Sequence, residues 1–528
     1  VPFDEGQFAV LEEGAELNEG YVVMAKRGTI FRNWDYFQET LPAEMLPLFK
    51  TESLSSFTGT LTANLLKIIG SWLFFTLLFH NLGAVILRRK EIKTFGFFKN
   101  IGLGMAVFMG LMFLLGTVGL LKVSVLWVVT ILALIAGATK LPLLLQTLKN
   151  AHFKISLKKE NWWVPLVLLL SGIPMALNII ETIKPYPGGF DSLVRYHNTP
   201  NLLAQYEGLV AHLPAYNYEL IFGLGRILFN STMIGAGLSL LGAFLGFGLL
   251  FTLLNKKFRW QESFLLMAIF LSLPMTQFML SVEPKIDLPL LFFSLLAVYE
   301  AIKSRYAWAG FWLGICLGIK ATTVLLMFTL LAYFAFNFWG VLAAAGTTVF
   351  ALGLLNGVGQ LFFLRFLEHN LQTGLTIGLL VLSLGMFLTV FYKKKPTTKQ
   401  VKSLFLMGGI MMLTFSPWVV KGVVDNDSFS ANAIMHGGNS DLQQEIMASG
   451  TLDTCHVAEH GNEIDRYSGY FEGHDIFLPL VMLWDSTINS GQPNNRISNI
   501  GFLFLGFAVF GIFAFQEAKR KDPEYKKI

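Results

Sequence analysis

Residues 232–254 read TMIGAGLSLLGAFLGFGLLFTLL, a run of apolar and small residues that contains no charged side chain. An α-helix needs about 20 such residues to cross the hydrocarbon core of a bilayer, so this stretch predicts a membrane-spanning helix. The composition of the whole chain agrees, because 54% of its residues are hydrophobic and 14% are charged. A soluble domain usually carries about 25% charged residues. The sequence therefore predicts an integral membrane protein that crosses the bilayer several times.

Similar apolar runs extend outward from this stretch in both directions and predict an all-α polytopic protein with about 13 transmembrane helices. The other runs lie at 64–86, 99–120, 123–139, 162–182, 262–282, 288–303, 307–320, 321–338, 346–366, 372–392, 403–420 and 498–516. Several runs have the length of one crossing and no more. The 307–320 run is short, so a hairpin with the next run that turns at Lys320 is a second interpretation of this region.

Clusters of Lys and Arg between the apolar runs predict the orientation of the chain. These clusters follow the first, third, fifth, seventh, eleventh and last runs, and all fall on one side of the membrane if every run crosses once. By the positive-inside rule this side is the cytoplasm. We therefore expect a multi-pass protein of the plasma (inner) membrane with basic cytoplasmic loops. The net charge of +5 belongs to these connectors and does not indicate nucleic-acid binding.

The same alternation of sides divides the chain into five regions. Residues 1–60 form an acidic extramembrane segment, 61–160 hold the amino-terminal transmembrane helices, 161–420 form a transmembrane core with an outer loop at 183–231, 421–497 form a second outer loop, and 498–528 hold the last transmembrane helix and a basic cytoplasmic tail. The tip of the helix hairpin from Glu283 to Asp287 also falls on the outer side.

The first outer loop is longer than a connector between two helices needs to be. Residues 185–225 read PYPGGFDSLVRYHNTPNLLAQYEGLVAHLPAYNYELIFGLG. Asp191 follows a Pro-Gly-Gly turn shortly after a predicted crossing helix, and Arg195 and His197 come after it. One interpretation is a catalytic carboxylate with polar helpers at the membrane boundary. The other is a solvated Asp191 that caps a helix beginning at Ser192.

Two further segments place charged residues at the outer side. In SVEPKIDLPLLFFSLLAVYEAIKSR, Glu283 and Asp287 crowd the outer end of a hairpin. Asp287 lies at a helix start, where the helix dipole favours a carboxylate, but such a tip also suits a cation or sugar hydroxyls. In WAGFWLGICLGIKATTVLL, Lys320 interrupts an apolar run. Its ammonium either extends to the interface or binds a lipid phosphate.

The second outer loop contains His436, Cys455, His456, His460 and His474, but their spacing matches no standard zinc pattern. We therefore assign no metal site from the sequence. The chain also lacks a phosphate-binding P-loop, a dinucleotide fingerprint and a Gly-x-Ser-x-Gly motif. An ATP-driven pump is accordingly not supported.

Taken together, these segments resemble the GT-C glycosyltransferases, a superfamily that includes protein O-mannosyltransferases, lipid A aminoarabinose transferases and many bacterial membrane transferases. The resemblance covers about 162–516 and depends on GGFDSLVRYH with AYNYELIFGLG, EPKIDLPLLFFSLLAVYEA, GFWLGICLGIKATTVLL and SPWVVKGVVDN, in this order and on the expected sides. The region 64–160 looks like the extra amino-terminal spans of long members. The residues after Pro-Trp depart from the family pattern.

The resemblance implies that the chain transfers a sugar from a polyprenyl-phosphate-linked donor to an acceptor hydroxyl on the outer face. Asp191 would be the general base. Asp287, with Glu283 as a second choice, would orient the sugar or the acceptor, or hold a divalent cation. Lys320 would neutralise the leaving phosphate with Arg195 as a helper. His197 and Tyr218 would also contact the substrate.

Two other functions remain open from the sequence. A non-catalytic GT-C-like scaffold or accessory subunit would use 1–60 and 421–497 to dock partner proteins. A transporter usually shows broken helices in two similar halves, and the chain has no internal repeat. The expected partners are thus membrane lipids and a polyprenyl-phosphate sugar, with protein partners for the scaffold.

Overall fold

The computed structural model describes residues 54–88, 94–150, 195–272, 276, 279–280, 285–357, 369–393 and 395–426. Within these ranges the protein is built from α-helices and contains no β-strand, as the apolar runs predict. The helices are α4 (Leu54–Ile86), α5 (Thr94–Thr117), α6 (Val123–Ala138), α7 (Leu141–Asn150), α9 (Asn198–Tyr206), α10 (Asn217–Phe229), α11 (Thr232–Leu254), α12 (Trp260–Ser272), α14 (Asp287–Ile302), α15 (Tyr306–Ile319), α16 (Thr323–Trp339), α17 (Val341–Gly357), α18 (His369–Lys393) and α19 (Thr398–Asn426).

Among the described residues, five helices are long and apolar enough to cross a membrane, by length and composition. The candidate spans are Thr62–Ile86, Phe95–Thr117, Thr232–Leu254, Thr373–Tyr392 and Thr398–Asn426. They coincide with five of the predicted apolar runs. Six further predicted runs coincide with shorter helices, namely α6, α12, α14, α15, α16 and α17. The predicted spans 162–182 and 498–516 lie outside the described residues, as do the segments 1–53 and 427–497.

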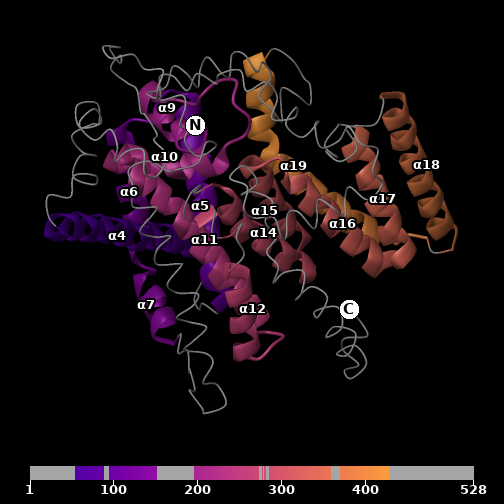
Figure 1. Ribbon diagram of the computed structural model, residues 1–528, viewed down its shortest axis with the longest axis horizontal. Coiled ribbons are helices and arrows are strands. Elements are labelled where there is room, and N and C mark those ends of the chain that lie inside the picture. The colour runs from indigo at the N-terminus through magenta and orange to yellow at the C-terminus, as the bar shows by residue number, and fades with distance from the viewer. Residues whose placement is uncertain are drawn as a thin grey trace.

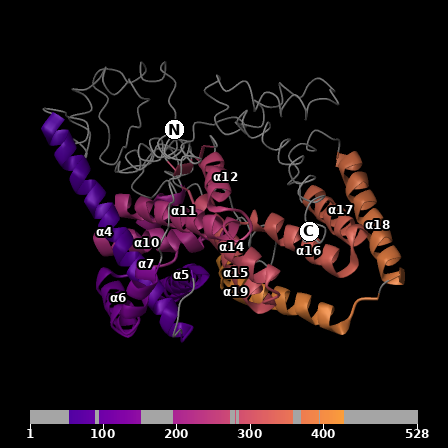
Figure 2. The same cartoon turned by 90° about the horizontal axis from the view of Figure 1, so that it is seen from below.

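The helices form a large group and a smaller one. In Figures 1 and 2, α4 to α6, α10, α11, α14 and α15 crowd together, whereas α17 and α18 lie at the far side with α16 leading to them. The Ser383 hydroxyl on α18 donates to the carbonyl of Gly346 on α17 over 2.9 Å, which ties the smaller group together. α19 then returns to the large group and packs along α15 (Figure 2).

Two helix pairs approach each other backbone to backbone. On α4 and α5, a Cβ added to Gly83 would collide with the backbone of Asn100. On α15 and α19, a Cβ added to Gly310 would collide with the carbonyl of Met407. Small residues at such positions are typical of membrane helices, because lipid tails leave van der Waals contact as the main source of attraction between helices.

α10 is part of the helical core, although the sequence predicts an outer loop over 183–231. It forms an antiparallel hairpin with α11 that turns at Asn230, which has a positive φ of 49°. The Ser231 side chain caps α11 by accepting a hydrogen bond from the amide of Ile234 over 3.3 Å. Almost every side chain from Asn217 to Leu228 is buried, and α10 contacts α5, α11 and α15. The prediction for 183–231 did not include this helix, because α10 is shorter than the apolar runs that predict crossing helices.

One end of the large group collects basic residues, and we call it the basic end. There the ammonium of Lys99 on α5 lies 2.6 Å from the Glu300 carboxylate on α14 and 3.7 Å from the centre of the Trp308 ring. Arg305 approaches the same carboxylate at 3.4 Å, and Lys256 donates to the Tyr299 hydroxyl over 3.3 Å. The connectors that hold Lys256 and Arg305 thus meet at one end of the bundle.

Candidate functional site

Charged side chains from separate helices also meet at the opposite end of α14, where Asp287 occupies the first turn. The ammonium of Lys320 donates to Oδ1 of Asp287 over 2.6 Å. α15 ends at Ile319, and Lys320 takes an extended backbone conformation (φ −155°, ψ 133°). The break at the end of α15 therefore brings Lys320 to the amino terminus of α14. Both side chains are partly exposed, at 28% for Lys320 and 22% for Asp287, so solvent or a ligand can reach the pair.

The second oxygen of Asp287 is not used by this ion pair. Asp287 Oδ2 is buried and has no hydrogen-bond partner among the described residues. A buried carboxylate oxygen without a partner is unfavourable, because it has lost water without gaining a donor. Asp287 therefore keeps hydrogen-bonding capacity that its contact with Lys320 does not use.

Glu219 on α10 lies within electrostatic reach of this pair. Its side chain is fully buried, and neither carboxyl oxygen has a hydrogen-bond partner in the described part of the chain. Burial raises the pKa of Glu219 to about 7, and the charge of Asp287 adds to this increase. The charges of Arg195 and Lys320 act in the opposite direction. We refer to Arg195, Glu219, Asp287 and Lys320 as the charged cluster.

Asn217 fixes the start of α10 beside the charged cluster. Its amide group donates to the carbonyl of Ile315 on α15 over 3.2 Å. Its Oδ1 accepts a hydrogen bond of 2.7 Å from the indole N–H of Trp418 on α19. A Cβ added to Gly318 would collide with the Asn217 side chain, so the two helices touch here. Glu219 follows Asn217 within the first turn of α10. These contacts therefore hold Glu219 near the end of α15 that carries Lys320.

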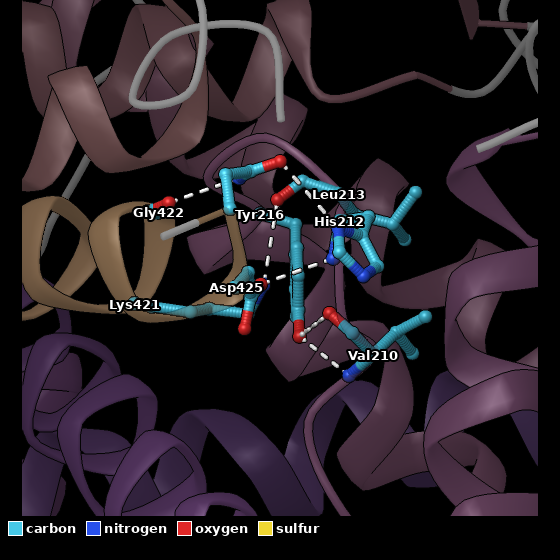
Figure 3. A network of polar contacts seen from close by, with 8 residues as sticks. Val210, His212, Leu213, Tyr216, Lys421, Gly422 and Asp425 are labelled. Atoms are coloured by element: carbon cyan, nitrogen blue, oxygen red, sulfur yellow. Dashed lines mark hydrogen bonds and ion pairs between the residues drawn. The ribbon is translucent and has the colours of Figure 1, made fainter. Parts of the chain in front are cut away.

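A second network holds the loop before α10 against the end of α19 (Figure 3). Asp425 Oδ2 accepts from the backbone N–H of His212 over 3.0 Å and from the ammonium of Lys421 over 2.5 Å. Lys421 also donates to the carbonyl of Leu213 over 3.5 Å. The Tyr216 hydroxyl accepts from the amide of Val210 over 2.9 Å, which closes the loop on itself. We call this network the loop clamp, and it sets the direction in which α10 begins.

The structure thus brings together three residues that the sequence singled out, namely Arg195, Asp287 and Lys320. The His197 ring is buried and stacks on Phe222 with centroids 5.3 Å apart. The Tyr218 hydroxyl donates to the carbonyl of Leu238 over 2.9 Å. Both residues therefore lie in packing positions within the core.

Two other predicted site residues, Asp191 and Glu283, lie outside the described residues. The loop histidines His436, His456, His460 and His474, and Cys455, also lie outside them. Within the described ranges, no three or more His, Cys, Asp or Glu side chains are grouped so that they could hold a metal ion.

Sequence reasoning missed Glu219, Asn217 and Trp418. Glu219 is the single carboxylate in the apolar stretch NYELIFGLG, and a lone acidic residue in such a stretch could have been recognised as a candidate. The Asn217–Trp418 contact joins residues that are far apart in the sequence, and nothing local indicates it. No protein-family model, curated protein or solved structure matches this chain. A functional proposal therefore depends on the residues of the charged cluster.

Proposed function

We propose that this chain transfers a sugar from a polyprenyl-phosphate-linked donor to an acceptor hydroxyl at the outer face of the membrane. The proposal includes a GT-C-like bundle of about 13 crossing helices, with the basic connectors in the cytoplasm of a bacterial cell. The chain would reside in the plasma (inner) membrane. The five candidate spans and the gathering of basic connectors at one end of the bundle are in keeping with this topology.

The observation that carries the proposal is the ion pair between Lys320 and Asp287. It lies at the end of α14 opposite the basic end, which is the outer side in the predicted topology. A lysine at the end of an apolar helix is expensive to insert into a membrane and is retained where it binds an anion or forms a partner contact. Arg195 adds a second positive charge near the buried Glu219. A phosphate group therefore finds two cations within one region.

The proposed reaction follows from these positions. The acceptor oxygen attacks the anomeric carbon of the sugar, and the bond between this carbon and the phosphate oxygen breaks. The lipid phosphate leaves with the electron pair, and negative charge grows on its oxygen. Lys320 and Arg195 stabilise this charge more in the transition state than in the ground state. By the family resemblance, Asp191 accepts the proton of the attacking hydroxyl.

Asp287 has a separate role in the proposal. Through Oδ1 it holds the Lys320 ammonium in one place, so that less rotamer entropy is lost when the phosphate binds. Its Oδ2 is buried, so a sugar hydroxyl can donate a hydrogen bond to this oxygen only after donor binding opens access to it. Replacing Asp287 with asparagine keeps the shape and removes the charge, and it should weaken both contacts.

The proposal is tested by following the transfer of radiolabelled sugar from polyprenyl-phosphate donors in membranes that contain the full chain. We expect Asp191→Asn, Asp287→Asn and Lys320→Met to lower transfer by about 10²-fold or more at equal expression. Lys122→Met is the matched control, because Lys122 pairs with Glu207 at 3.2 Å on the surface and both side chains are about half exposed.

Two outcomes would contradict the proposal. Full activity of Asp287→Asn and Lys320→Met would remove the charged cluster from the reaction. A wild-type protein that binds no polyprenyl-phosphate donor and instead purifies with a stoichiometric protein partner would favour the scaffold function.

A further inference from the structure

We infer that Glu219 is a positioning residue whose carboxyl group holds a proton while a phosphate anion occupies the charged cluster. Glu219 releases this proton when the anion leaves. This inference rests on the proposed function, and it adds that donor binding is coupled to proton uptake. Glu219 does not touch the donor itself, because its side chain has no exposed surface.

The geometry of Glu219 requires an explanation. A fully buried carboxylate is strongly destabilised unless donors surround it, and among the described residues neither oxygen of Glu219 has one. Structural carboxylates in such positions are normally paired, as Glu300 is with Lys99 at the basic end. Glu219 is instead placed beside an ion pair whose own carboxylate, Asp287, also has an unpartnered oxygen. Two carboxyl groups near each other are most stable when one of them carries a proton.

The charges of the cluster indicate what that proton controls. With a neutral Glu219, Arg195 and Lys320 outweigh Asp287, and the cluster has one net positive charge. A lipid-linked sugar phosphodiester has one negative charge, so this state is complementary to it. When Glu219 ionises, the net charge of the cluster falls to zero. The attraction for the phosphate is then weaker, and the bound anion in turn makes ionisation of Glu219 less favourable.

The direction of the pH dependence follows from the groups that surround Glu219. Within the part of the chain that the structure describes, the charged groups that act on it are Arg195, Lys320 and Asp287. The Tyr216 hydroxyl is also near, but burial raises the pKa of Tyr216 well above its usual value, so it remains neutral at physiological pH. With a Glu219 pKa of about 7, a rise in pH through neutrality converts the neutral residue into the ionised one. Affinity for the phosphate should therefore fall as pH rises.

The first experiment detects the proton directly and does not depend on any ligand. Infrared spectra of the full chain in lipid nanodiscs, recorded from mildly acidic to mildly alkaline pH, should contain a protonated-carboxyl band that disappears with a midpoint near neutrality. Glu219→Gln should lack this band. Glu262→Gln should retain it, because the Glu262 side chain is 47% exposed on α12. Lys320→Met should move the midpoint to higher pH, because a cation that favours the ionised form is lost.

The second experiment measures the coupling to the anion. A short-chain prenyl phosphate methyl ester, a phosphodiester with one negative charge throughout this range like the proposed donor, is titrated into the same nanodiscs at a series of pH values. For the wild type, the dissociation constant should rise by up to about tenfold for each pH unit above the midpoint, the limit for one coupled proton. For Glu219→Gln, it should change little over the same range.

Each result has a defined meaning. An infrared spectrum that does not change with pH overturns the inference. A protonated-carboxyl band that remains in Glu219→Gln and keeps its midpoint pH in Lys320→Met also overturns it. Equal pH dependence of binding in wild type and Glu219→Gln also overturns it. Absence of prenyl phosphate binding at every pH overturns the proposed function, whereas the infrared titration then still decides whether Glu219 holds the proton.

Discussion

Replacing Lys99 with methionine is expected to destabilise the protein by about 3–5 kcal/mol, the usual result of removing one partner from a buried ion pair. The ammonium of Lys99 lies 2.6 Å from the Glu300 carboxylate, and the side chains are only 3% and 0% exposed. Methionine keeps the length of the side chain and its contact with Trp308 but removes the charge. Glu300 would then keep only Arg305, at 3.4 Å and 55% exposed. Such an exposed partner is a weak replacement.

The double variant Lys99→Met with Glu300→Gln separates the charge effect from a loss of packing. It removes both charges at nearly constant volume and should recover most of the lost stability, because no uncompensated charge stays buried. Lys122→Met is the matched single control. It breaks the half-exposed pair with Glu207, and we expect it to cost less than about 1 kcal/mol.

The assay is unfolding of the purified full chain in detergent micelles, followed by tryptophan fluorescence. Trp308 is a local reporter because its ring lies under the Lys99 ammonium. Unfolding of Lys99→Met at the wild-type midpoint would refute the reasoning. A double variant no more stable than Lys99→Met would show that packing, and not the buried charge, causes the loss.

Two further predictions concern other parts of the bundle. Gly310→Ala should destabilise the protein by about 1–3 kcal/mol, because the added Cβ meets the backbone of Met407. Gly378→Ala is the control and should be neutral or stabilising, because nothing lies within 4 Å of a Cβ at this position. The unfolding midpoints of the two variants are compared with that of the wild type. The pKa of Glu219 is about 7 in the folded state and 4.5 as its usual value. Between pH 4.5 and pH 7 the folded state therefore binds a proton that the unfolded state has lost. The free energy of unfolding should fall by about 3 kcal/mol as pH rises through this range. Thermal unfolding across pH should show this fall in wild type, and an equally steep fall in Glu219→Gln would contradict it.

The long helices were predictable from the sequence because length and composition decide them. The uncharged run 232–254 corresponds to α11 residue for residue, and the 64–86 run corresponds to most of α4. In these segments a local property, the absence of charge over about 20 residues, is sufficient. The shorter helix α10 escaped recognition, because its burial comes from α5, α11 and α15, which lie elsewhere in the chain.

The candidate site was predictable in part for a similar reason. Asp287 and Lys320 are conspicuous because each interrupts apolar sequence, and the alternation of spans places both on the same side. Their contact at 2.6 Å depends on how α15 packs beside α14, which no local pattern describes. Glu219 is the single carboxylate of an apolar stretch, but its complete burial is known only from the fold. The tertiary neighbours, and not the residue type, distinguish it from an ordinary surface glutamate.

The contact between α15 and α19 has a consequence for which substitutions the protein tolerates. Gly310 and Gly314 lie against the backbone of α19, so each position excludes every larger residue by steric collision. On α19, Leu413 and Val420 are well exposed, and in a bilayer they would face lipid tails. Lipid accepts any apolar side chain at about equal free energy. Natural sequence variation should therefore be concentrated on the outward face of α19 and almost absent from the glycine face of α15.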